Sequence, residues 1–88
     1  MQLELEGGGT ASSRSFDGRV LTFTSSRAFA PGAPVRFFAV LGGNRQSFEG
    51  RSIGSKRMED ALFVVRVRLV NLRRDARAAL NAGLGPVL

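Results

Sequence analysis

The stretch that decides the fold runs from Gly18 to Leu41 and reads GRVLTFTSSRAFAPGAPVRFFAVL. Over residues 20–24, apolar side chains alternate with threonines in a run rich in β-branched and aromatic residues, which predicts a strand. The APGAP segment at residues 30–34 ends that strand, because proline lacks a backbone donor and glycine adopts the positive φ of a turn. A second strand is predicted at residues 35–41. Its apolar character on both faces favours a central strand covered on each side, or one whose second face meets a helix or another subunit. The rest of the chain must therefore complete a sheet around these two strands.

The segment before this stretch is predicted to contain one short strand and a loop. Residues 2–6 alternate, with Leu3 and Leu5 on one face and polar side chains on the other, as in a half-buried strand. Residues 7–13, GGGTASS, have the composition of a flexible polar loop. We expect Phe16 to anchor this loop to the sheet.

Two further strands are predicted after the central pair. A tight hairpin turn at residues 42–44 leads into a polar strand at 46–53, a charged turn at 54–60 and the strongest strand at 62–70. In this last strand the apolar residues at odd positions share one face. Arg66 and Arg68 lie on the other face, which we expect to be at most partly buried.

The C-terminal segment is predicted to form a helix. Asn71 is a suitable N-cap for a helix from residue 72 or 73 to about residue 82, ended by Gly83 and Gly85-Pro86. Its apolar stripe is Leu72, Ala76, Ala79, Leu80 and Gly83, with Arg73, Arg74 and Arg77 pointing away. The predicted fold is mainly β: one domain over residues 1–88 with an ordered core at 3–84, forming a small antiparallel β-barrel of about five to six strands with one C-terminal α-helix.

The composition excludes several kinds of site. The chain has no cysteine and no histidine, which excludes disulfides, thiolate and histidine metal sites and a histidine general base. The formal net charge is +6, and all but one of the 13 cationic residues are arginine, whose planar fork suits phosphate or carboxylate. No apolar run is long enough to span a membrane, and the N-terminal MQLELE is too polar for a signal peptide, so we expect a cytoplasmic protein.

No pattern in the sequence predicts catalysis. Residues 50–56, GRSIGSK, have the composition of a phosphate-binding loop, but the lysine follows a serine and no helix is predicted after it. A serine–lysine pair in the same surface turn lacks the apolar enclosure that activates a lysine. We therefore expect a non-catalytic protein without a metal or a cofactor.

The order of motifs resembles the PilZ domain family. Residues 13–18 read SRSFDG and precede a strand, a Pro–Gly turn and a strand that opens with valine. FEGRSIG at residues 48–54, the strand at 63–69, and Arg77 and Leu80 in the closing helix also resemble the family pattern. The resemblance spans roughly residues 3–84 and implies a small barrel that acts in bacterial motility, secretion or surface signalling.

PilZ domains that bind cyclic di-GMP resemble one another in two motifs, and this chain keeps part of one. Ser15 and Gly18 match the Asp/Asn-x-Ser-x-x-Gly box, whereas Ser13 replaces its first residue and cannot make the paired contacts of a carboxylate to a guanine edge. The other motif, two arginines separated by three residues before the first strand, has no counterpart in the sequence. The candidate ligand-binding residues are Ser13, Arg14, Ser15, Gly18 and Arg19. In the alternative interpretation, the serines and Gly18 only shape the turn that enters the next strand.

We therefore interpret the chain as a non-catalytic, PilZ-like protein-interaction module that has lost most of its cyclic di-GMP site. A protein partner is expected, and an incomplete sheet edge near residue 1 suggests a homodimer. Two alternatives remain open: a PilZ domain that still binds cyclic di-GMP, and a small basic barrel that binds nucleic acid. The latter depends on a basic stripe of Arg36, Arg51, Arg66 and Arg68, and the lack of tyrosine and tryptophan for base stacking weakens it.

Overall fold

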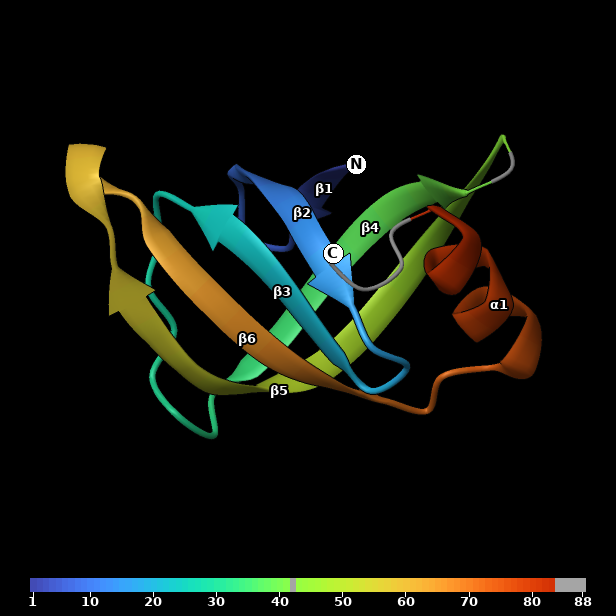
Figure 1. The fold of residues 1–88 in the computed structure, drawn as a ribbon. Helices are drawn as coiled ribbons and strands as arrows, with labels where there is room; N and C mark the ends of the chain where they lie inside the picture. The colour runs from blue at the N-terminus through green and yellow to red at the C-terminus, as the bar shows by residue number, and fades with distance from the viewer. Residues whose placement is uncertain (42, 84–88) are drawn as a thin grey trace.

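The structure, a computed structural model, describes residues 1–41 and 43–83 and consists of six strands and one helix (Figure 1). The elements are β1 (Gln2–Leu5), β2 (Thr10–Phe16), β3 (Val20–Ser25), β4 (Pro34–Leu41), β5 (Asn44–Arg57), a 3₁₀ turn (Glu59–Ala61), β6 (Phe63–Val70) and α1 (Arg74–Gly83). The predicted fold class is confirmed: the strands form a closed antiparallel barrel, and the helix is C-terminal.

The order of strands around the barrel is β1-β2-β3-β6-β5-β4, and every neighbouring pair is antiparallel. The two strands that the sequence singles out, β3 and β4, do not pair with each other. β3 lies between β2 and β6, whereas β4 lies between β5 and β1. The Pro–Gly segment therefore carries the chain across one end of the barrel instead of forming a hairpin (Figure 1).

β1 closes the barrel. It pairs with β2 at Leu3↔Ala11 and with β4 at Glu4↔Phe38, and the Glu6 N–H donates to the Arg36 carbonyl at 2.9 Å. The prediction of an incomplete sheet edge near residue 1 was therefore wrong, because β1 has a partner on both sides. The predicted homodimer loses the structural reason on which it was based.

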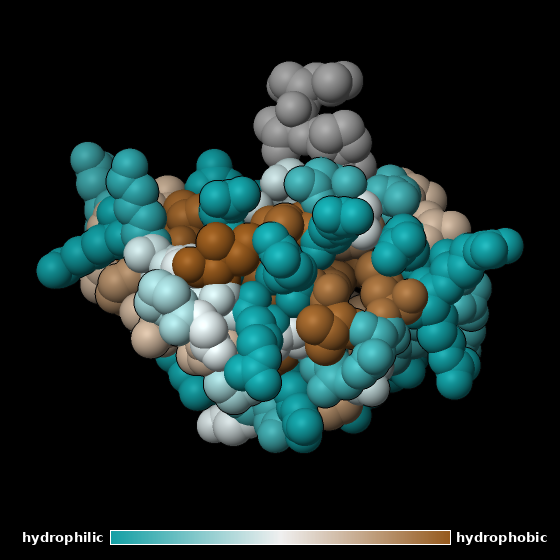
Figure 2. Space-filling model, turned by 90° about the horizontal axis from the view of Figure 1, so that it is seen from below, coloured by the Kyte–Doolittle hydropathy of each residue, from teal (hydrophilic) through white to brown (hydrophobic). Residues whose placement is uncertain are grey.

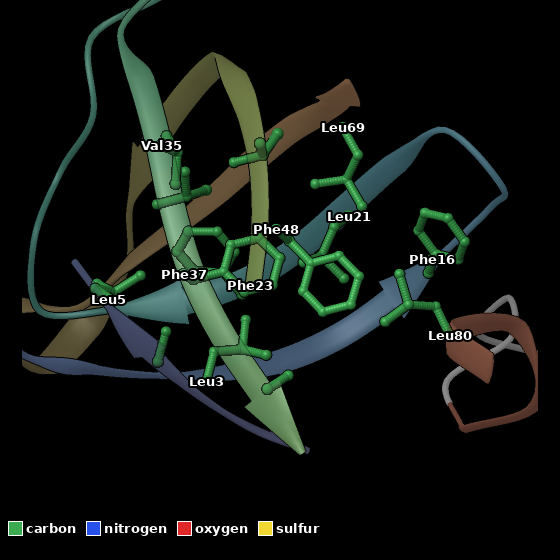
Figure 3. Packing of buried hydrophobic residues seen from close by; sticks show 14 of the residues in the cluster. Leu3, Leu5, Phe16, Leu21, Phe23, Val35, Phe37, Phe48, Leu69 and Leu80 are labelled. Atoms are coloured by element: carbon green, nitrogen blue, oxygen red, sulfur yellow. The ribbon is translucent and has the colours of Figure 1, made fainter. Parts of the chain in front are cut away.

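Alternation along each strand separates a core from an outer wall. The predicted inner face of β6 is confirmed, since Val65, Val67 and Leu69 are buried while Arg66 and Arg68 are exposed. The aromatic rings of the core converge in the middle of the barrel (Figure 3), where Phe37 and Phe48 stack with ring centroids 5.2 Å apart. The core residues are Leu3, Leu5, Ala11, Phe16, Leu21, Phe23, Phe29, Val35, Phe37, Ala39, Leu41, Phe48, Val65, Val67, Leu69, Ala76 and Leu80.

Within the chain, β4 is not covered on both faces, so the first of the two interpretations of this strand was wrong. Val35, Phe37, Ala39 and Leu41 point into the core, but Val40 on the other face is 61% exposed. A barrel wall is a single layer of strands, so each strand has only one inner face. The apolar outer side chain of Phe38 is partly buried, with the guanidinium of Arg45 lying 4.3 Å from its ring centroid.

Helix α1 covers one end of the barrel, and the β3–β4 segment covers the opposite end (Figure 1). Ala76 and Leu80 are buried, and Leu80 lies near Phe16 (Figure 3), so the predicted apolar stripe is confirmed for the described residues. Asn71 does not cap the helix, which begins at Arg74: Asn71 has a φ of 54° and donates its side-chain N–H to Glu49 at 3.1 Å. Gly83 is within α1, and Gly85-Pro86 lies outside the described residues.

Two predicted loops are partly strand. Of the expected loop at residues 7–13, only Gly7–Gly9 turns the chain, and the polar residues from Thr10 onward pair with β1 and β3. The expected charged turn at 54–60 is also shorter, because β5 continues to Arg57 along β6. In both places pairing with neighbouring strands outweighs the turn-forming composition.

The β3–β4 segment is fastened to β5. Gly32 has a φ of 83°, which glycine adopts without strain, and the Ala33 N–H closes the turn onto the Ala30 carbonyl at 3.0 Å. The Gly32 N–H also donates to the Ser52 carbonyl at 2.7 Å. The Ser52 and Ser55 hydroxyls both donate to the Phe29 carbonyl, which holds the Phe29 ring over the end of the core.

We predict that Gly50→Ala destabilises the barrel. Gly50 is buried opposite Leu69, and a Cβ there would collide with the carbonyl oxygen of Arg68 and lie 2.7 Å from the Val67 side chain. β5 and β6 would have to separate, at a cost of about 1 to 3 kcal/mol. Urea denaturation measures the loss, with Ser47→Ala at an exposed site of the same strand as the control. Equal stability of the two variants would show that β5 and β6 do not approach as closely as described.

Candidate functional site

The outer face of β5 and β6 gathers three exposed arginines, Arg51, Arg66 and Arg68, which we call the arginine wall. Arg51 and Arg68 are directly opposite each other in the β5–β6 register. Arg66 lies two residues before Arg68 on the same face and is opposite Gly54, which has no side chain to share the space. These three members of the predicted basic stripe are therefore neighbours on one surface.

The fourth member, Arg36, lies one row farther along the barrel. It is opposite Glu49 in the β4–β5 register, and its Nε is 3.8 Å from the Glu49 carboxylate. Its charge is therefore partly balanced within the protein. Arg36 borders the arginine wall but is not part of the unbalanced group.

No carboxylate of the described residues lies within 4.0 Å of a guanidinium nitrogen of the arginine wall. The ion pairs of the described residues, Arg36–Glu49 and Arg45–Glu4, involve arginines outside the wall. Within the arginine wall, Arg51 is fastened to the fold by a hydrogen bond from its Nη1 to the Gly32 carbonyl at 3.0 Å. Like charges directly opposite each other in a sheet destabilise it. An anionic ligand or partner would remove this repulsion.

Aliphatic side chains surround the arginine wall. Val70 and Ile53 are 41% and 37% exposed, and Val64 and Val20 are partly buried on the same outer face. The register places Val20 beside Arg68, and Val64 two residues before Arg66. Figure 2, seen from below Figure 1, shows apolar patches interleaved with polar side chains on this face.

The structure does not bring the residues of the PilZ-like box together. Ser13 is opposite Phe23, a core residue, and its hydroxyl donates to the Met1 carbonyl at 2.9 Å. Ser15 is opposite Thr22, whose side chain lies on the outer face, because a bulge shifts the register between the two serines. The two serines therefore lie on opposite faces of β2.

The remaining candidate residues shape the β2–β3 hairpin or lie on its surface. Gly18 has a φ of 99°, and Arg19 accepts a backbone hydrogen bond from Leu69 at 3.0 Å. The exposed guanidinium of Arg14 lies 3.9 Å from Met58 Sδ. These positions agree with the alternative interpretation, in which Gly18 serves the turn.

Asp17, which the sequence analysis did not single out, fastens this hairpin. Its carboxylate accepts hydrogen bonds from the backbone N–H groups of Val20 at 2.8 Å and Arg19 at 2.9 Å. These bonds, with a smaller contribution from the nearby Arg66 charge, hold the pKa of Asp17 below its ordinary value. The Asp-Gly pair before a strand was the sequence signal for this turn.

A groove of about 650 Å³ lies between α1 and the β4–β5 hairpin. Its lining carries both signs of charge, from Glu6, Glu49, Arg36 and Arg73, around apolar side chains such as Leu72. Sequence reasoning missed this groove, because it depends on where the helix packs. It lacks the one-sided charge of the arginine wall.

Residues 1–41 and 43–83 contain no group of three or more acidic side chains placed to hold a metal ion. None of the helical residues described forms a segment long and apolar enough to cross a membrane.

Comparisons with protein-family models, with curated proteins and with solved structures found no match.

We predict a pH-dependent role for Asp17 in stability. Asp17→Ala removes two hydrogen bonds to the backbone and should cost about 1 kcal/mol at pH 7. Because the folded state lowers the pKa of Asp17, this contribution is complete above the ordinary value of 3.8 and is lost as the pH falls through the folded pKa. Thermal unfolding of the unmodified protein and the variant from pH 7 to pH 2 should therefore show a difference in melting temperature that narrows below about pH 4. A difference in melting temperature that stays constant over this pH range would contradict the role of the carboxylate charge.

Proposed function

We propose that the protein is a non-catalytic, PilZ-like interaction module that contacts another protein through the arginine wall. The supporting observation is the unbalanced charge of Arg51, Arg66 and Arg68 on one outer face, where no carboxylate of the described residues is within 4.0 Å. The sequence resemblance to PilZ domains suggests a role in bacterial motility, secretion or surface signalling.

The proposal treats the PilZ-like box as a site that no longer binds cyclic di-GMP. In support, Ser13 donates to the Met1 carbonyl and lies on the face of β2 opposite to Ser15, so the two hydroxyls do not converge. A ligand on the outer face would meet Ser15, Thr22 and the nearby arginines as polar contacts. The carboxylate of this hairpin is Asp17, whose Oδ1 already accepts hydrogen bonds from the Val20 and Arg19 N–H groups, and a guanine edge needs paired hydrogen bonds.

A nucleic-acid-binding barrel is the weaker alternative. Surfaces that bind single strands combine cations with exposed aromatic rings on which bases stack. The residues of the arginine wall and its aliphatic neighbours include no aromatic side chain. Phe38, a partly buried aromatic on the outer surface, lies beneath Arg45 on β4 and away from the arginine wall.

Isothermal titration with cyclic di-GMP, at low and at moderate salt, tests the exclusion of that ligand. We expect no heat of binding at ligand concentrations of a few hundred micromolar, because the box lacks convergent hydrogen-bonding groups. Sedimentation of the same sample gives its mass in solution. Micromolar or tighter binding that is lost in both Arg14→Ala and Ser15→Ala would overturn the proposed function in favour of a cyclic di-GMP receptor.

A further inference from the structure

The spacing of the arginine wall matches an extended acidic chain. Arg66 and Arg68 are separated by two residues of one strand, which places their Cβ atoms about 6.6 Å apart. Acidic side chains at alternate positions of an extended peptide have the same spacing, because they follow the same strand geometry. Arg51 broadens the charged surface, since it lies opposite Arg68 on the neighbouring strand.

The aliphatic side chains beside the arginine wall indicate that a binding partner should carry apolar residues as well as acidic ones. In an extended peptide, the residues between the acidic ones point the other way, but flanking apolar residues on the acidic face can reach Ile53, Val64 and Val70. Burial of those partly exposed side chains would add binding free energy that salt does not screen. A purely charged chain would leave them in water.

We propose that the arginine wall binds an acidic segment of a partner protein, in extended conformation, whose carboxylates are flanked by aliphatic side chains. This inference rests on the proposed function and specifies the chemistry of the partner. The carboxylates pair with the guanidinium groups of Arg66 and Arg68, for which planar two-point contacts are available. The aliphatic side chains of the partner cover Ile53, Val64 and Val70 beside the arginine wall.

Fluorescence anisotropy of labelled peptides, at about 50 mM and about 300 mM salt, tests this inference. The first probe is a peptide of about ten residues built from glutamates and leucines, which spans about 33 Å when extended, equal to the longest extent of the protein, 33 Å. The second replaces every leucine by serine, and the third is an oligothymidylate of similar length. The protein variants are Arg66→Gln/Arg68→Gln and a matched control, Arg73→Gln/Arg74→Gln, which removes the same charge from the first residue of α1 and the residue before it.

We expect the glutamate–leucine peptide to bind most tightly and to keep measurable affinity at the higher salt concentration. The Arg66→Gln/Arg68→Gln protein should lose about tenfold or more in affinity, since each lost hydrogen bond to a charged group costs about that factor. The control protein should change by less than about threefold, the effect of net charge alone. Thermal unfolding checks that both variants remain folded.

The other outcomes separate the two proposals. Tight glutamate–leucine binding that both variants weaken equally would overturn the arginine wall as the site, and with it the inference and the proposed function. Equal binding of the serine peptide would overturn the aliphatic requirement. Preferential binding of the oligothymidylate would overturn the inference and the proposed function together. Absence of binding by all three probes would overturn the inference alone.

Discussion

The fold depends on the pairing of β1 with β4. This contact turns a six-stranded sheet into a closed barrel, and it is short: Glu4↔Phe38 and Leu5↔Phe37, extended by the hydrogen bond from Glu6 to Arg36. Closure leaves one enclosed inner face, which is filled by apolar side chains that include Phe16, Phe23, Phe29, Phe37 and Phe48. It also gives every strand an outer face, and the charged residues of β5 and β6 must lie there.

The arginine wall follows from this closure. Arg66 and Arg68 alternate with Val65 and Val67, so burial of the valines orients the arginines outward. Gly50 permits the close approach of β5 to β6, beside the pair in which Arg51 is opposite Arg68. The shift in register after Ser52 then leaves Arg66 opposite Gly54. A charged surface with little internal compensation is thus produced by the same residues that allow the core to pack.

The sequence predicted what alternation and turn chemistry determine. The inner face of β6, the Pro–Gly turn at Gly32 and the apolar stripe of α1 are local patterns, and the structure confirms them. The pairing of β1 with β4 could not be read from the sequence, because it joins short segments far apart in the chain. For the same reason Thr10–Ser13 was expected to be a loop, although both neighbouring strands supply hydrogen-bond partners. That Arg51 and Arg68 are neighbours also depends on the register between β5 and β6, which composition does not specify.

Amide hydrogen exchange, followed by NMR, tests the closure of the barrel most directly. The account predicts that the Glu6 amide, which donates across the β1–β4 contact, exchanges far more slowly than an unstructured amide, as do the amides of Val65 and Val67 in β6. Exchange of Glu6 at the rate of an unstructured peptide, with β6 still protected, would contradict closure. β4 would then have a free edge, and an open sheet would replace the barrel on which the arginine wall is built.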